Sequence, residues 1–184
     1  MTDDRARSER SSPPDAAARA RRIALVVTDN DGVLTDGTVH VSASGELVKV
    51  YSVRDGMGVE RLRERGIATG ILTREQPALI AGRAAKLELR HLWTGVRDKH
   101  AQLARILAET QLSIDQLAYI GDDLNDLEII TAIGEAGLTA APADAMPSVR
   151  QAVHYVCDAP GGRGAFRDLA EWLLRLRSNH GGPR

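Results

Sequence analysis

The chain has 184 residues, of which 43% are hydrophobic and 27% are charged, and its formal net charge is −1. This composition is typical of one globular domain and provides no basic field that would favour nucleic acid or a membrane surface. A single cysteine, Cys157, excludes an intrachain disulfide and a cysteine-based zinc site. No apolar run approaches the roughly 18 residues needed to span a bilayer. Because the N-terminus also lacks the apolar core of a secretory signal, we expect a cytoplasmic protein.

The two ends differ in composition from the rest of the chain. Residues 1–20 are rich in Arg, Asp, Ser, Pro and Ala, which predicts a disordered tail. A second, flexible tail is predicted at 178–184. One domain is therefore expected over 21–177.

Between the tails, short apolar runs alternate with helical patterns. The expected strands are 23–29, 67–73, 91–93 and 117–123, followed by β-type segments in AGLTAA and VHYVC. The expected helices are 55–66, 76–87, 98–110, one behind 117–123, one near 146–151, and a final helix carrying Phe166, Leu169, Leu173 and Leu176 on one side. Two stretches around Ser44-Gly45, 38–42 and 47–51, predict a β-hairpin. This alternation predicts an α/β fold, a Rossmann-like three-layer αβα arrangement with a mainly parallel sheet.

Polar residues stand at the carboxyl ends of these strands, where parallel sheets bind ligands. In VVTDNDGVLTDG, a buried strand ends at Asp29 and Asp31, and a later strand ends at Asp122 and Asp123. So many carboxylates are costly without a cation, and an all-oxygen set is typical of a magnesium site.

An aspartate beside magnesium indicates phosphoryl chemistry. One carboxylate would attack phosphorus, and a second would protonate the leaving alkoxide and then activate water. The transferred group also needs a hydroxyl donor and a cation, which Thr73 and Lys99 would supply.

Each residue also has a purely structural interpretation. Asp-Asn-Asp-Gly is compatible with a turn or a calcium loop, although His40 stands where the calcium loop needs glutamate. Thr73 is a candidate helix cap and Lys99 a solvated helix residue. Asp122 and Asp123 are candidate charges at a helix N-terminus. Their order and their joint position at strand ends favour catalysis.

As an ordered set, DNDGVLTDG, Thr73, Lys99 and GDDLND resemble the four motifs of the haloacid dehalogenase superfamily of phosphatases, over roughly 22–176. The resemblance implies that Asp29 is the nucleophile and Asp31 the general acid and base. It also implies that Mg²⁺ is held by the Asp29 carboxylate, the Asp31 backbone carbonyl and Asp122, that Asp123 and Asp126 support the metal, and that Thr73 and Lys99 hold the phosphate.

Further stretches resemble a capless branch of this superfamily. The hairpin, SVRDGMG and GGRGAFRD are similar to phosphatases of 3-deoxy-octulosonate 8-phosphate and of 2-keto-3-deoxynonulosonate 9-phosphate. The resemblance implies no separate cap domain and a homotetramer in which a neighbouring subunit covers each active site. The hairpin at 38–51 would contribute to that interface.

The substrate implied by this branch is a phosphorylated sugar acid. Its candidate binding residues are Arg54, Glu75, Arg83, Lys86 and Arg163. Arg83 and Lys86 would bind a sugar carboxylate, or they would only solvate a helix face. The segment with Glu75 favours the nonulosonate type, whereas GGRGAFRD favours the octulosonate type.

One position departs from the family pattern, because Arg74 stands where glycine normally follows the motif threonine. Its side chain would crowd the phosphate pocket or attract an acidic substrate. Arg74 is the only support for one alternative, a catalytically weakened regulatory subunit. A phosphatase of another sugar or nucleotide phosphate is the second alternative that stays open.

Overall fold

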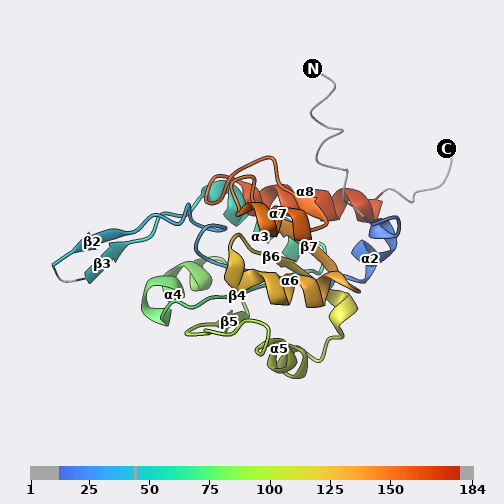
Figure 1. Cartoon of the computed structure of the whole chain (residues 1–184), viewed down its shortest axis with the longest axis horizontal. Helices are drawn as coiled ribbons and strands as arrows, with labels where there is room; N and C mark the ends of the chain where they lie inside the picture. The colour runs from blue at the N-terminus through green and yellow to red at the C-terminus, as the bar shows by residue number, and fades with distance from the viewer. Residues whose placement is uncertain (1–12, 44, 179–184) are drawn as a thin grey trace, which may run out of the picture.

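The computed structural model describes residues 13–43 and 45–178 and is built around a six-stranded parallel sheet (Figure 1). The strand order is β5-β4-β1-β6-β7-β8. The strands are β1 (Leu25–Thr28), β4 (Ala68–Leu72), β5 (His91–Trp93), β6 (Leu117–Ile120), β7 (Leu138–Ala141) and β8 (Tyr155–Val156). In register, Val26 of β1 lies opposite Thr69 of β4 on one side and Ala118 of β6 on the other. β1 is thus a central strand, and all four of its residues are buried, as its continuous apolar sequence predicts.

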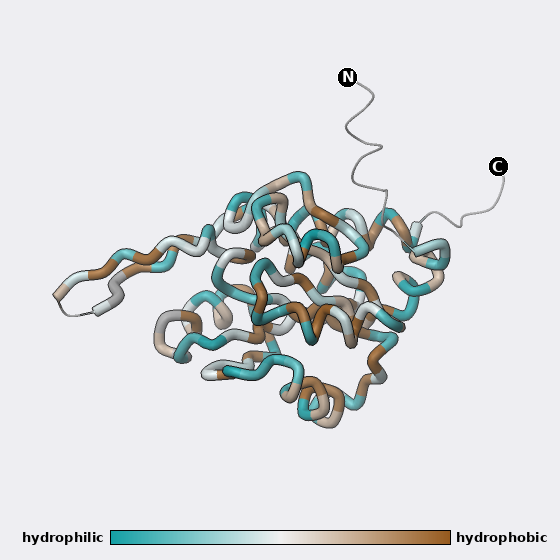
Figure 2. Tube along the Cα trace, in the orientation of Figure 1, coloured by the Kyte–Doolittle hydropathy of each residue, from teal (hydrophilic) through white to brown (hydrophobic). Residues whose placement is uncertain are grey.

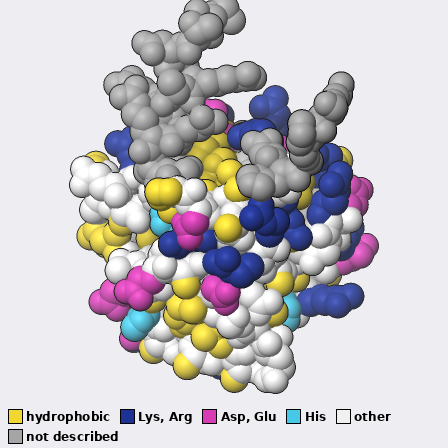
Figure 3. Space-filling view, turned by 90° about the vertical axis from the view of Figure 1, so that its right-hand side faces the viewer, with side chains coloured by type: hydrophobic (Ala, Val, Ile, Leu, Met, Phe, Trp, Pro, Cys, Tyr) yellow, Lys and Arg dark blue, Asp and Glu magenta, His cyan; other side chains and the backbone are white. Residues whose placement is uncertain are grey.

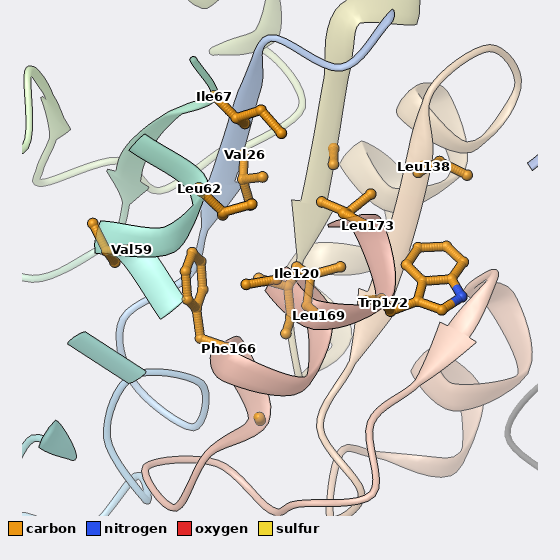
Figure 4. Close-up of a cluster of buried hydrophobic side chains, with 14 of the residues drawn as sticks. Val26, Val59, Leu62, Ile67, Ile120, Leu138, Phe166, Leu169, Trp172 and Leu173 are labelled. Carbon is orange, nitrogen blue, oxygen red and sulfur yellow. The ribbon is translucent and has the colours of Figure 1, made fainter. Parts of the chain in front are cut away.

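One face of the sheet is covered by α2 (Ala16–Arg22), α3 (Val53–Arg63) and α8 (Ala165–Ser178). Phe166, Leu169 and Leu173 of α8 pack in one cluster with Val26 and Ile120 of the sheet (Figure 4). Their spacing of three and four residues places them on one side of the helix, which is why α8 lies flat on the sheet.

The other face is covered by α5 (Leu103–Thr110), α6 (Leu127–Gly134) and α7 (Pro147–Ala152). Leu25 and Val27 of β1 face this second core, whereas Val26 faces the first, as strand alternation requires. α4 (Pro77–Lys86) follows β4 and packs on the first core through Ile80. Two short 3₁₀ turns are η1 (Ile114–Gln116) and η2 (Leu124–Asp126). The three-layer α/β prediction is confirmed.

A two-stranded antiparallel arm, β2 (His40–Ser42) and β3 (Gly45–Val48), projects from the body of the molecule (Figure 1). Hydrophobic residues alternate along it (Figure 2). Four valines on the arm and its base are substantially exposed: Val39, Val41, Val48 and Val50. Between Asp29 and Thr73 the described residues form this arm, α3 and β4, and no separate cap domain.

Three expected boundaries need correction, besides shifts of up to three residues at the ends of other elements. Helix α2 begins at Ala16, inside the tail expected over 1–20, because Ala16 and Ala20 are buried and Arg19 donates to the carbonyls of Gly134 and Gly137 at 2.9 and 3.1 Å. The remaining part of that tail, 1–12, lies outside the described residues, as does 179–184 of the C-terminal tail.

The other two corrections concern the hairpin and one helix. The hairpin strands are shorter than the expected 38–42 and 47–51, and the second begins earlier, at Gly45. The helix expected over 98–110 begins only at Leu103, because residues 99–102 form turns. These turns direct Lys99 into the sheet edge described below.

None of the described helices is both long and apolar enough to cross a bilayer. The face opposite the hairpin arm shows cationic and anionic side chains interspersed with apolar ones (Figure 3).

Candidate active site

Three polar residues follow three neighbouring strands at the same edge of the sheet. Asp29 follows β1, Thr73 follows β4 and Asp122 lies two residues after β6. Because β4, β1 and β6 are adjacent and parallel, their carboxyl ends converge. A cavity of about 300 Å³ opens there, lined by Asp29, Asp31, Gly32, Gly37, Thr73, Arg74, Glu75, Asp122, Asp123 and Asn125.

The loop after β1 is folded tightly over this edge. Asp29 Oδ1 accepts a hydrogen bond from the Asn30 backbone at 2.6 Å. Gly32 has a φ of +80°, and a Cβ there would come within 2.0 Å of Asp122 Oδ2. Only glycine therefore lets this loop approach the carboxylate of Asp122. Gly161, the first residue of GGRG, packs on the Gly32 carbonyl in the same way, which explains why glycine stands at that position.

Lys99 is a buried cation between two carboxylates. Its Nζ lies 2.6 Å from Asp29 Oδ2 and 2.6 Å from Asp126 Oδ1, and only 1% of the residue is exposed. Burial works against its charge, but Asp29 and Asp126 outweigh burial and raise the pKa of Lys99. The interpretation of Lys99 as a solvated helix residue is excluded by this burial.

Asp126 holds the neighbouring loop together. Its Oδ1 accepts from Lys99 and from the Tyr119 hydroxyl, each at 2.6 Å, and its Oδ2 accepts from the backbone of Asp122 and Asp123 at 3.1 and 3.3 Å. Four donors thus occupy its two oxygens. Asp126 orients the loop that presents Asp122.

The carboxyl group of Asp29 is buried and that of Asp122 is half-buried, and nearby cations compensate their charge only in part. Burial raises the pKa of Asp29 to about 7, against the lowering effect of Lys99. Burial, followed by the charges of Asp29 and Asp126, raises the pKa of Asp122 to about 8. Oxygens of Asp29, Asp122 and Asp126 lie within 4.8 Å of one another, so they fit a small divalent cation that binds oxygen ligands.

The structure decides whether Thr73 and Asp123 act as caps, an interpretation that the sequence left open for both. Helix α4 begins after its N-cap Gln76, three residues beyond Thr73, so Thr73 does not cap it. Instead Thr73 Oγ1 accepts from the Glu75 backbone at 3.1 Å at the cavity wall. Asp123 does cap a turn, since its side chain accepts from Leu124 N at the start of η2.

Asp31 has a partner that the sequence reasoning missed. Lys49, on the strand-like leg after β3, places its Nζ 2.7 Å from Asp31 Oδ1 and 3.9 Å from Glu75 Oε1. The available signal was the run VKVY, in which alternation predicts that Lys49 and Tyr51 face the same side. Tyr51 indeed donates to Asn30 Oδ1 at 3.1 Å.

The predicted substrate residues are distributed unevenly. Glu75 lines the cavity at the sheet edge, while Arg54 and Arg163 line a neighbouring, wider cavity at the base of the hairpin. Arg83 donates to the Ser52 carbonyl at 2.9 Å and lies 5.4 Å from the Tyr51 ring centroid. Lys86 is exposed at the end of α4 and does not line either cavity. Arg74 is exposed and lines the cavity at the sheet edge.

Known proteins are similar to this chain in sequence and fold. Residues 94–164 match the haloacid dehalogenase-like hydrolase family. The 3-deoxy-D-manno-octulosonate 8-phosphate phosphatase of Yersinia pestis is 38% identical over 160 residues, which are 87% of this chain and 84% of that protein. The Haemophilus influenzae phosphatase, solved with cobalt, has a TM-score of 0.82 at 34% identity and covers 87% of this chain and 92% of its own.

A third relative was solved with ligands. The Moraxella catarrhalis phosphatase, in complex with magnesium, phosphate and KDO, has a TM-score of 0.81 at 32% identity over 89% of this chain and 92% of its own. The sequence identity and coverage of these relatives, together with the converging carboxylates, show the family to which the chain belongs. The chain therefore belongs to the haloacid dehalogenase family and is a phosphatase, a phosphoric monoester hydrolase.

Proposed function

We propose that the chain hydrolyses the phosphate monoester of an acidic 2-keto-3-deoxy sugar, with 3-deoxy-D-manno-octulosonate (KDO) 8-phosphate as the first candidate. The observation that carries the proposal is the convergence of Asp29, Asp31 and Thr73 on one cavity at the sheet edge, with Lys99 paired to Asp29 behind it. The choice of sugar acid is supported by the relatives' activity and by KDO in the related structure. A nonulosonate 9-phosphate is the second candidate.

In the first step, a carboxylate oxygen of Asp29 attacks phosphorus while the bond from phosphorus to the sugar oxygen breaks. Asp31 donates its proton to that oxygen, so the sugar leaves as an alcohol and Asp29 carries the phosphoryl group. Asp29 and Asp31 both line the cavity, so one bound phosphate ester would contact both side chains.

In the second step, Asp31 takes a proton from water as the water oxygen attacks phosphorus. The bond between phosphorus and Asp29 breaks, phosphate leaves and the Asp29 carboxylate is restored. The same side chain thus acts first as an acid and then as a base.

Two further groups would hold the phosphoryl oxygens. Thr73 Oγ1 accepts a hydrogen bond from the Glu75 backbone, so its own hydroxyl hydrogen is free to be donated. Lys99 uses two of its three N–H donors on Asp29 and Asp126, which leaves a third for a phosphoryl oxygen. Both donors act in a largely dry site, where electrostatic stabilisation is strong.

Mg²⁺ fits the carboxylates of Asp29 and Asp122, together with the backbone carbonyl of Asp31, while Asp126 and Asp123 support the loop. The fit rests on the carboxylate oxygens of Asp29, Asp122 and Asp126, which lie within 4.8 Å of one another, and on the burial that raises the pKa of Asp29 and of Asp122. When bound, the ion would neutralise charge on the phosphoryl group.

The sugar acid would extend from the catalytic cavity toward the hairpin base. Asp36 lines the neighbouring cavity and Gly37 the catalytic one, so the two cavities adjoin along the chain. Arg54 and Arg163 there provide cations for the sugar carboxylate. Arg83 and Lys86 remain predictions; Arg83 is already engaged with Ser52 and Tyr51.

We also propose a homotetramer in which the hairpin arm of a neighbouring subunit closes each active site. The exposed valines of the arm support this, because apolar side chains on a projecting hairpin are stabilised by burial against a partner. The cytoplasm remains the predicted location.

The test is phosphate release with Mg²⁺ across KDO 8-phosphate, a nonulosonate 9-phosphate, neutral sugar phosphates and a nucleotide. We expect a strong preference for one keto-acid sugar, loss of activity in EDTA and recovery with Mg²⁺. Asp29→Asn should reduce turnover at least about 10³-fold at unchanged fold, because the nucleophile is gone. A flat profile, or an active Asp29→Asn variant, would refute the proposal.

A further inference from the structure

Alternate residues of the C-terminal leg of the hairpin, the segment 48–51, point toward the active site. Lys49 and Tyr51 point inward and contact the loop after β1, whereas Val48 and Val50 are exposed. Only 2% of the Lys49 side chain is exposed. A nearly dry ammonium group is costly unless it is closely paired, so its position is specific.

Three donors converge on a single oxygen of Asp31. Oδ1 accepts from Lys49 Nζ at 2.7 Å, from Asn30 Nδ2 at 3.1 Å and from Thr35 Oγ1 at 3.3 Å. An oxygen that accepts three hydrogen bonds is a poor place for a proton. A proton carried by this carboxyl group therefore belongs on the other oxygen, Oδ2.

Lys49 also connects two strand ends. Its Nζ lies 3.9 Å from Glu75 Oε1, and Glu75 donates its backbone N–H to Thr73 Oγ1. The two catalytic aspartates are thus held by two different buried lysines, Asp29 by Lys99 and Asp31 by Lys49.

We propose that Lys49 is a positioning residue that fixes the Asp31 carboxyl group so that Oδ2 delivers its proton to the leaving group. This inference rests on the proposed function, in which Asp31 donates a proton to the sugar oxygen as the bond from phosphorus breaks. Lys49 itself transfers no proton; it holds Oδ1 in place. The hairpin leg is in this way a part of the catalytic site.

The consequence depends on the leaving group. A sugar alkoxide is a strong base that needs a proton as it departs, whereas 4-nitrophenolate departs without one. Loss of Lys49 should therefore slow a primary alkyl phosphate far more than an aryl phosphate. A purely structural role would slow both by the same factor.

The experiment compares kcat/KM for KDO 8-phosphate and for 4-nitrophenyl phosphate in wild type, Lys49→Met, Lys49→Gln and Lys49→Arg. If KDO 8-phosphate is not hydrolysed, the primary alkyl phosphate that the substrate panel identifies takes its place. We expect Lys49→Met to lower kcat/KM about 30- to 100-fold for the alkyl ester and less than about threefold for the aryl ester. Lys49→Arg should recover most of the alkyl activity, and Lys49→Gln should lie between.

The matched control is Arg105→Met, which removes an exposed ion pair with Glu109 far from the site and should change neither value. Melting curves identify variants that are only partly folded. An equal loss on both substrates, or no loss on either, overturns the role of Lys49 while leaving the proposed function standing. A wild type that hydrolyses neither ester overturns both.

Discussion

The Asp122 carboxylate lies close to those of Asp29 and Asp126. Its charge state therefore depends on whether a proton or a cation neutralises this cluster. Burial and the neighbouring Asp29 and Asp126 raise the pKa of Asp122 to about 8, from 3.8 for an unperturbed aspartate. Between these two values the folded chain keeps a proton that the unfolded chain has released. Stability of the metal-free chain therefore falls as pH rises through this window.

Asp122→Asn removes this cost, because the amide has the same shape and never ionises. In EDTA, we expect the variant to melt at a higher temperature than wild type, and the difference should grow from pH 5 to pH 8. Each kcal/mol gained corresponds to about 2–4 °C at this chain length. Calorimetry at several pH values measures the difference.

Magnesium provides the internal check. It should raise the melting temperature of wild type at pH 8 and leave Asp122→Asn nearly unchanged, since only the folded wild type binds the ion well. A difference between the two proteins that is constant from pH 5 to pH 8 would contradict the assignment.

At the scale of elements, α3 and α8 are joined by a buried carboxylate. Asp55 of α3 is 1% exposed, and its oxygens accept from the backbone of Gly164 and Arg167, each at 3.1 Å. The first N–H groups of a helix lack intrahelical partners, so Asp55 caps α8 from another helix. Gly58 lets the helices approach, since a Cβ there would lie 3.0 Å from the Arg167 Cα. Asp55 and Gly58 belong to the stretch SVRDGMG, and Gly164 and Arg167 belong to GGRGAFRD, so this contact explains why the two stretches occur together in one chain.

Asp55→Ala should lower the free energy of unfolding by about 1–3 kcal/mol, because it leaves buried backbone donors without an acceptor. Urea unfolding measures this as a lower midpoint with an unchanged slope. Asp158→Ala, at an exposed aspartate, is the matched control and should stay within about 0.5 kcal/mol of wild type. A neutral Asp55→Ala would mean that water satisfies the α8 N-terminus.

At the scale of the whole molecule, the projecting hairpin arm exposes apolar side chains that a single chain does not bury. Val41 is 71% exposed and Val50 59%. Lys49, at the base of the arm, contacts Asp31, which lines the cavity at the sheet edge. Assembly and activity are therefore expected to depend on each other.

We expect light scattering to report a tetramer for wild type and smaller species for Val41→Glu, since a charge opposes burial of the arm against a partner. Activity on the sugar phosphate should fall with the tetramer fraction. Ala104→Glu adds the same charge to the exposed side of α5 and should change neither property. A fully active monomer would refute closure of the site by a neighbouring subunit.

The sequence by itself determined the sheet and the residues at its edge. Continuous apolar runs predicted β1, β4 and β6, and polar residues directly after them identified Asp29, Thr73 and Asp122, because chain order places strand ends together in a parallel sheet. The capping interpretation of Thr73 could be rejected only once the start of α4 was known.

Only the tertiary structure decided the contacts made by long side chains and by the segments outside the sheet. Lys49 and Lys99 reach Asp31 and Asp29 from a hairpin leg and a turn, and nothing local in the sequence determines where a four-carbon side chain ends. Helix α2 was missed because Ala and Arg resemble a tail until burial against α8 is known. Periodicity and strand order are local properties, whereas the pairing of buried charges depends on distances between elements that only the folded chain sets.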